Sequence, residues 1–146
     1  MTGLLLIAHA PLASALATVA EHTFPNCAPQ VTALDVTPDM SVDEVEARAR
    51  ALLSTAGHAE VLVLTDVFGA TPCNAARRLL DDSGHVQVVS GVNVPMLWRT
   101  LCYSNEPLAE LVARASEGGV KGIVKAEPDP SSNPPCDSCR CSSPLS

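Results

Sequence analysis

Val61-Leu62-Val63-Leu64, followed by Thr65-Asp66, is the clearest mark of the fold in this chain. A short aliphatic run without a polar residue is typical of a strand buried on both faces, as in a parallel sheet. Leu4 to Ala8 is a second run of this kind. Val31 to Val36 and Val86 to Val89 complete a set of four predicted strands.

Segments with helical spacing separate these strands. Pro11 is suited to open the first helix. Ser41, with Glu44 three residues later, predicts a capping box for the second helix, and Gly57 fits its C-terminal end. Thr71-Pro72 begins the third. Strands that alternate with helices predict an α/β fold, an open doubly wound and mainly parallel sheet of four strands.

The C-terminal part is predicted to differ from the rest. A last helix is expected over Pro107 to Glu117, and Gly118-Gly119 should end it. Val120 to Val124 then suits a short strand at the sheet edge. From Glu127 the composition turns rich in Pro, Ser and Cys, which predicts a disordered tail over residues 127–146 and one folded domain over residues 1–126.

The composition excludes several classes of function. The chain of 146 residues has a formal net charge of −7, so it lacks the basic surface expected of a protein that binds nucleic acid. No apolar run is long enough to span a bilayer. Leu4 to Ala8 could imitate a signal peptide, but no Lys or Arg precedes it and His9 interrupts it. A cytoplasmic protein is expected.

Three polar residues are predicted to meet at one edge of the sheet. His9 follows the first strand and Asp66 follows the third, and these strands are neighbours at the switch point of a flavodoxin-like order. A carboxylate on one ring nitrogen would fix the tautomer of a nucleophilic histidine. Thr71 opens a helix at the same edge, where N–H groups and its hydroxyl favour a phosphate.

Each of these residues also has an ordinary interpretation. A histidine at a strand end is usually a solvated loop residue, an aspartate there can cap a turn, and threonine is a common N-cap. Their convergence favours His9 as a carrier of a phosphoryl group. The chain has neither a Walker lysine nor a Gly-rich nucleotide fingerprint, which favours a protein over ATP as the phosphoryl donor.

Longer motifs carry a family resemblance. The chain resembles the EIIA domain of the mannose family of the bacterial phosphoenolpyruvate-dependent sugar phosphotransferase system over about residues 1 to 126. The motifs that carry it are Leu5-Leu6-Ile7-Ala8-His9, Leu64-Thr65-Asp66-Val67-Phe68-Gly69-Ala70-Thr71-Pro72-Cys73-Asn74-Ala75-Ala76, Gly91-Val92-Asn93-Val94-Pro95-Met96-Leu97 and, more weakly, Gly119-Val120-Lys121.

The resemblance implies a phosphotransferase that works by protein histidine phosphoryl transfer. His9 would accept a phosphoryl group from the phosphocarrier HPr and pass it to a histidine of an EIIB protein, and through it to membrane EIIC/EIID. Asp66 would orient the imidazole and Thr71 would stabilise the phosphate. The resemblance also implies a homodimer that exchanges a C-terminal edge strand, for which Val120 to Val124 is the candidate. It implies no metal and no small cofactor.

The chain departs from the family pattern in two ways. Ala70 stands where the family turn usually has a second glycine, which would be strained if that position needed a positive φ, so a mildly altered turn is expected. Many relatives continue through a linker into EIIB, whereas this sequence stops after a short tail. The EIIB partner is therefore expected on a separate chain or not at all. In the latter case phosphorylated His9 would be a regulatory signal, read by a binding partner without sugar transport.

Other sites are weaker alternatives. Cys73 near a helix start suggests a hydrolase or redox site, although a buried small residue is the commoner role. A response-regulator receiver would need acidic residues after the first strand, and the related subunit of dihydroxyacetone kinase is expected to lack the Thr-Pro-x-Asn turn. Cys136, Cys139 and Cys141 suggest zinc, but without a nearby histidine an incidental cluster is favoured. No role is assigned to the remaining histidines, His22, His58 and His85.

Overall fold

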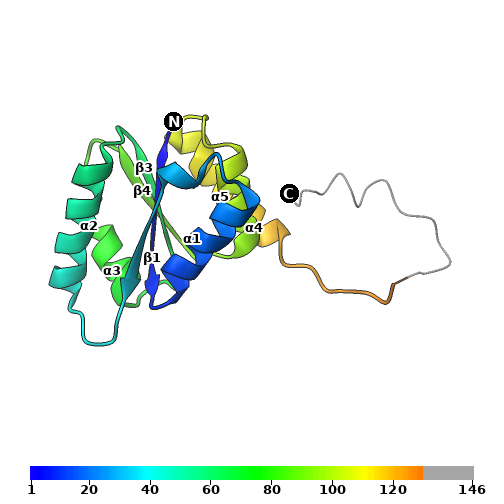
Figure 1. Ribbon diagram of the computed structural model, residues 1–146, viewed down its shortest axis with the longest axis horizontal. Helices are drawn as coiled ribbons and strands as arrows, with labels where there is room; N and C mark the ends of the chain where they lie inside the picture. The colour runs from blue at the N-terminus through cyan, green and yellow to red at the C-terminus, as the bar shows by residue number, and fades with distance from the viewer. Residues whose placement is uncertain (130–146) are drawn as a thin grey trace.

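The protein is a four-stranded parallel sheet with helices on both faces (Figure 1). The computed structural model describes residues 1–129. The strands follow the order β2-β1-β3-β4, and every pair is parallel. Their bounds are β1 Gly3–His9, β2 Val31–Val36, β3 Val61–Thr65 and β4 Val86–Ser90. The predicted fold class is therefore confirmed, including the adjacency of the first and third strands.

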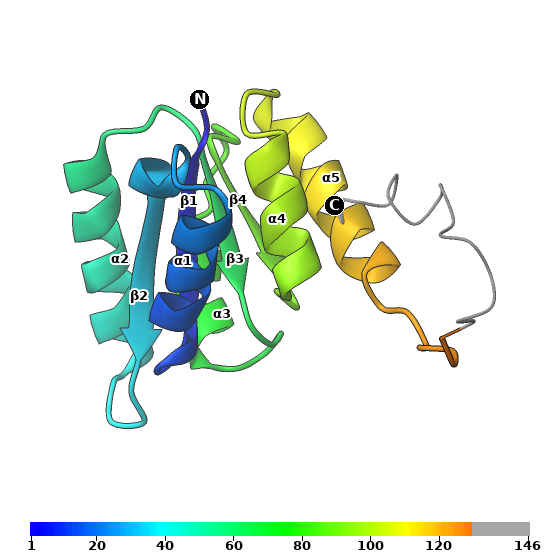
Figure 2. The same cartoon turned by 45° about the vertical axis from the view of Figure 1, so that its right-hand side comes forward.

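The helices divide between the two faces of the sheet (Figure 2). The second helix and the short third helix cover one face, and the other three long helices cover the opposite face. Their bounds are α1 Leu12–Thr23, α2 Val42–Ala56, α3 Thr71–Arg77, α4 Val94–Cys102 and α5 Leu108–Lys121, with a 3-10 turn η1 at Ala28–Gln30. No helix among residues 1–129 is long and apolar enough to cross a membrane.

The central strand β1 is buried because it has hydrophobic side chains on both faces. Leu4 and Leu6 pack in the core with α1, α4 and α5, whereas Leu5 and Ile7 pack in the core with α2 and α3. Side chains alternate across a strand, so a continuous apolar run supplies both cores at once. The run ends at His9, the first exposed side chain of β1.

Local capping signals mark both ends of α2 where the sequence predicts them. The Ser41 hydroxyl accepts a hydrogen bond from the Glu44 backbone N–H at 3.1 Å, so Ser41 caps α2. Gly57 ends α2 with a φ of 70°, a left-handed conformation that glycine adopts without strain. Pro11 is the N-cap of α1 rather than its first residue, so α1 begins one residue later than predicted.

The prediction for the end of the last helix is wrong. Helix α5 continues through Gly118 and Gly119 as far as Lys121, because these glycines allow a close approach to α4. A Cβ at Gly118 would lie 2.6 Å from the Arg99 Cβ, and one at Gly119 would lie 2.8 Å from the Met96 Cε. Tertiary packing thus outweighs the low helix propensity of glycine.

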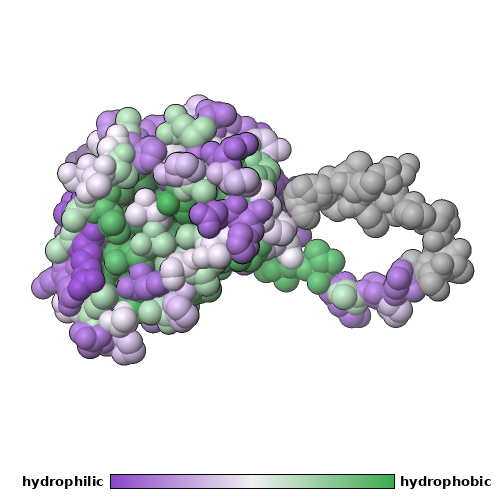
Figure 3. Space-filling view, viewed as in Figure 1, coloured by the Kyte–Doolittle hydropathy of each residue, from purple (hydrophilic) through white to green (hydrophobic). Residues whose placement is uncertain are grey.

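The expected strand over Val120 to Val124 is not formed within this single chain. Val120 is helical, and residues 122–129 contain no strand. Val120, Ile123 and Val124 are 70%, 78% and 76% exposed. Figure 3 shows hydrophobic surface where the chain leaves α5 and projects from the body. The predicted tail lies almost wholly outside the described residues, as do all three of its cysteines.

Candidate functional site

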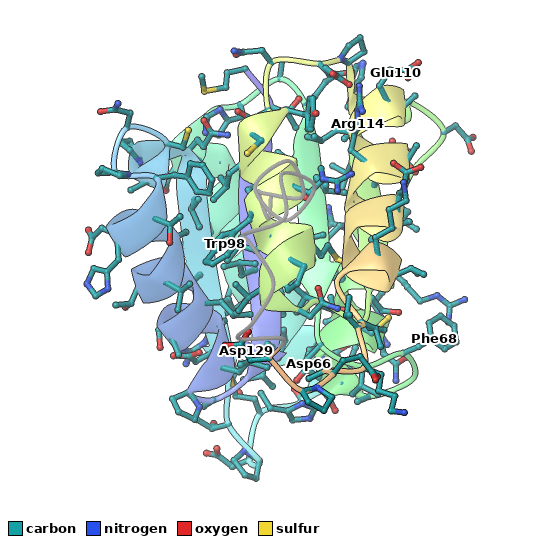
Figure 4. The ribbon with its side chains drawn as sticks, turned by 90° about the vertical axis from the view of Figure 1, so that its right-hand side faces the viewer. Asp66, Phe68, Trp98, Glu110, Arg114 and Asp129 are labelled. Atoms are coloured by element: carbon teal, nitrogen blue, oxygen red, sulfur yellow. The ribbon has the colours of Figure 1, made fainter. Side chains whose placement is uncertain are left out.

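His9 and Asp66 meet at the carboxyl edge of the sheet. His9 is the last residue of β1, and Asp66 directly follows β3, the neighbouring strand. The His9 Nδ1 lies 2.7 Å from the Asp66 Oδ2, and the His9 backbone N–H donates to the same oxygen at 3.0 Å. The predicted convergence of two residues 57 positions apart is confirmed. Figure 4 marks Asp66 at this end of the sheet.

The Asp66 carboxylate contacts the imidazole from a sheltered position. Its side chain is 14% exposed, whereas the side chain of His9 is 52% exposed. Burial alone would raise the pKa of Asp66, but hydrogen bonds from the His9 ring, the His9 backbone and the Val67 backbone outweigh it and lower the pKa. Asp66 is therefore ionised near neutral pH and favours a proton on Nδ1, which leaves the lone pair on Nε2.

The loop after Asp66 is held by the Val67 N–H, which donates to the Asp66 carboxylate at 2.9 Å, and by Asn74. Gly69 has a φ of 91°, so this is the residue of the turn that needs glycine. Ala70 has a φ of −91°, a value that any residue adopts, so the backbone strain that a positive φ would cause is absent at this position. The Asn74 side chain donates to the Gly69 carbonyl at 3.1 Å. Asn74 of the Thr-Pro-x-Asn motif thus serves to close the turn.

Thr71 and Cys73 have different surroundings in α3. Thr71 is the first residue of α3 and is half-buried. Within the described residues its hydroxyl makes no hydrogen bond to His9 or Asp66, so its role toward a phosphate stays a prediction. Cys73 is 1% exposed, which agrees with a buried core residue rather than a reactive thiol.

Two exposed apolar residues follow Asp66 in the chain. Val67 and Phe68 are 50% and 69% exposed, although they directly follow Asp66. Arg77 stacks over the Phe68 ring at 5.5 Å from its centroid. Figure 4 shows Phe68 pointing away from the body of the protein. An aromatic ring and a guanidinium exposed together are typical of a protein-binding surface.

Two further polar residues at this edge were missed by the sequence analysis. Asp35 near the end of β2 binds Ser14 in the first turn of α1, through hydrogen bonds of 3.0 and 2.6 Å. The pair is separated by 21 residues and matches no local motif, so only the packing of α1 against β2 reveals it. Among residues 1–129, no group of three or more His, Cys, Asp or Glu side chains could hold a metal ion.

The fold and the site together define an open doubly wound α/β protein with a histidine–carboxylate pair at its switch point. Residues 3–116 match the EIIA-man family, described as the PTS system fructose IIA component. The match covers most of the chain, and the protein belongs to this family of EIIA components of the phosphotransferase system. The resemblance drawn from the motifs is confirmed.

Relatives with known names agree with this assignment. The chain is 40% identical over 91 residues to the mannose-specific EIIAB component of Escherichia coli K12, which is 60% of this chain but 27% of that protein. It is 43% identical over 42 residues to the fructose-specific EIIA component of Bacillus subtilis, covering 29% of each. The chain thus matches little more than a quarter of the length of these curated relatives.

Solved structures share the fold. The mannose/sorbose-specific IIA subunit of Enterococcus faecalis aligns with a TM-score of 0.80 at 23% identity, over 88% of this chain and 96% of that one. An EIIA component from Streptococcus agalactiae aligns with a TM-score of 0.77 at 24% identity, over 86% of this chain and 97% of that one. At these identities the alignments establish the architecture alone.

Proposed function

We propose that this protein is a phosphoryl carrier whose His9 Nε2 accepts a phosphoryl group from one protein and passes it to another. The observation that carries the proposal is the contact of 2.7 Å between the His9 Nδ1 and the Asp66 Oδ2. It leaves Nε2 as the free nucleophile on a side chain that is 52% exposed. A partner protein can reach such a side chain, because the site is an open edge rather than a closed pocket.

Transfer proceeds by exchange of one bond to phosphorus. The Nε2 lone pair of His9 forms a bond to the phosphorus atom, and the bond from phosphorus to the donor's leaving nitrogen breaks. The proton on Nδ1 stays in its hydrogen bond to Asp66, and the positive charge that develops on the ring is opposed by the carboxylate. Transfer to the acceptor repeats the exchange in the opposite sense.

The partners follow from the family. We infer that phosphorylated HPr is the donor and that a histidine of an EIIB protein is the acceptor, which delivers the group to membrane EIIC/EIID. The Escherichia coli relative is named as an EIIAB component, which supports an EIIB acceptor. The exposed Val67 and Phe68, which follow Asp66 in the chain, suit the docking of both proteins. The regulatory alternative uses the same site, and no contact among residues 1–129 favours it.

Thr71 is proposed to stabilise the transferred phosphate. It stands at the start of α3, five residues beyond Asp66, and carries a hydroxyl that can donate to a phosphate oxygen. The turn closed by Asn74 on the Gly69 carbonyl supports this, because it keeps the start of α3 close to the carboxyl edge of β3. A Thr71→Val variant keeps the shape of the side chain and should shorten the lifetime of the phosphorylated protein.

A homodimer is proposed as the functional unit. β4 is an edge strand, and among residues 1–129 no strand pairs with its outer edge. The end of α5 and the chain that follows it carry the exposed Val120, Ile123 and Val124, which do not pack in either hydrophobic core of the described residues. Addition of this segment to β4 of a second copy would bury the apolar side chains and pair the open edge.

The proposal is tested by incubation with Enzyme I, HPr and phosphoenolpyruvate, followed by intact-mass analysis. We expect one acid-labile phosphate on the wild type and none on His9→Ala. His22→Ala is a matched control, because His22 is exposed at the far end of α1 and should leave phosphorylation unchanged. An unmodified wild type with active donors, or a phosphate that persists in His9→Ala, would contradict the proposal.

A further inference from the structure

The turn that carries His9 is held on both sides by neighbouring strands. On one side the His9 backbone N–H donates to the Asp66 carboxylate at 3.0 Å. On the other side the Ala10 backbone N–H donates to the Val36 carbonyl at 2.9 Å, which ties the turn to β2. Two residues later α1 begins. The short chain between His9 and α1 is therefore fixed at one end by these two bonds and at the other end by whatever anchors the start of α1.

Helix α1 begins without a capping side chain of its own. Its N-cap is Pro11, which offers no side-chain acceptor to the free N–H groups of the first turn. The Asp35 carboxylate of β2 supplies one instead, accepting from the Ser14 backbone N–H at 3.0 Å and from the Ser14 hydroxyl at 2.6 Å. The Ser14 hydroxyl also lies 3.1 Å from the Pro11 carbonyl, but its single proton favours the shorter bond to the charged group.

The pleat of β2 explains why this carboxylate faces α1. Leu34 and Val36 pack in the core with α2, so Asp35 between them points to the opposite face, where α1 lies. Asp35 is also in register with Ala8, the residue before His9. A negative charge at a helix N-terminus is further stabilised by the helix dipole. The carboxylate thus links the end of β2 to the start of α1 across the His9 turn.

We propose that Asp35 is a positioning residue for phosphoryl transfer, which caps α1 from the adjacent strand and so holds the His9 ring against Asp66. The inference rests on the proposed role of His9 as the phosphoryl acceptor. Without the cap, the first turn of α1 loses an acceptor for the Ser14 N–H, and the turn before it gains freedom. The imidazole then spends less time in the orientation that presents Nε2.

The test compares four variants of the full chain. Asp35→Ala removes the cap, Asp35→Asn keeps an oxygen for the Ser14 N–H without the charge, and Ser14→Ala removes only the bond to the hydroxyl. Ser41→Ala is the matched control, because it removes the N-cap of α2, which does not adjoin His9. Two readouts are used: the separation of the His9 ring nitrogen resonances, which reports the tautomer, and the dependence of phosphorylation rate on phospho-HPr concentration.

The expected result is specific to His9. Asp35→Ala should weaken the Nδ1–H tautomer signature and lower the maximal rate by about tenfold, with the half-saturating donor concentration unchanged. Ser14→Ala should give a smaller effect in the same direction, and it provides the test if Asp35→Ala fails to fold. Asp35→Asn and Ser41→Ala should resemble wild type. Wild-type signatures in both Asp35→Ala and Ser14→Ala would overturn the inference, as would a loss in Ser41→Ala of equal size. The tautomer signature needs no phosphate, so a wild type that takes up none would overturn the proposed function separately.

Discussion

Replacing Asp66 by asparagine removes the negative charge beside the His9 ring while keeping the size of the side chain. In the native protein the carboxylate accepts three hydrogen bonds, from the His9 Nδ1 at 2.7 Å, the His9 N–H at 3.0 Å and the Val67 N–H at 2.9 Å. An asparagine has a single oxygen. Whichever way the amide is turned, at least one of these donors faces an NH2 group instead of an acceptor.

The cost of this change falls on the transfer step, because the positive charge on the His9 ring grows as the phosphoryl group arrives. A hydrogen bond to a charged group contributes about 1.5–3 kcal/mol net. If this stabilisation is lost in the transition state, phosphorylation slows by about 10- to 150-fold. The fold should persist, since Asp66 lies outside both hydrophobic cores.

The assay is rapid-quench measurement of phosphoryl uptake from phospho-HPr, with circular dichroism to verify the fold. Asp39→Asn is the matched control, because Asp39 is an exposed carboxylate in the loop after β2 that binds Thr37 and does not contact His9. It should react at the wild-type rate. An Asp66→Asn protein that is folded and also reacts at the wild-type rate would refute the assignment of Asp66 to the mechanism.

Three further predictions concern stability and assembly. Gly69→Ala should destabilise the protein by about 1–2 kcal/mol in urea unfolding, because its φ is 91°, whereas Ala70→Gly should cost less than about 1 kcal/mol; equal losses would contradict this explanation of the turn. Burial would raise the pKa of Asp66, but hydrogen bonds from His9 and Val67 outweigh it and lower the pKa. The wild type should therefore be more stable than Asp66→Asn above the ordinary pKa of 3.8. That advantage should disappear as the pH falls through the folded-state pKa, and an advantage that instead grows in acid would show the sign to be wrong. The double variant Ile123→Glu/Val124→Glu should sediment as a monomer if these exposed residues form the dimer contact, and an unchanged dimer would exclude them.

Local signals in the sequence were enough for most of the fold. The uninterrupted apolar runs of β1 and β3 identify strands buried on both faces, since only such strands need no polar side. Ser41 and Gly57 mark the ends of α2 through bonds within a few residues. Parallel strands with helical connections then bring His9 and Asp66 to one edge.

Gly118 and Gly119 show where a local signal misleads. Their low helix propensity predicts a helix end, yet they lie inside α5 because α4 approaches too closely for a Cβ. Likewise, the φ of Ala70 could not be read from the residue type. It follows from the closed turn in which Gly69 alone takes the positive φ.

The sequence by itself therefore determined the four strands, their connections and the residues that cap α2, because these features depend on periodicity and on neighbours along the chain. Only the tertiary structure decided the contact of 2.7 Å between His9 and Asp66 and the capping of α1 by Asp35. Both join residues more than twenty positions apart, and their geometry depends on strand register and side-chain direction. A one-residue shift of β2 would turn Asp35 to the other face of the sheet.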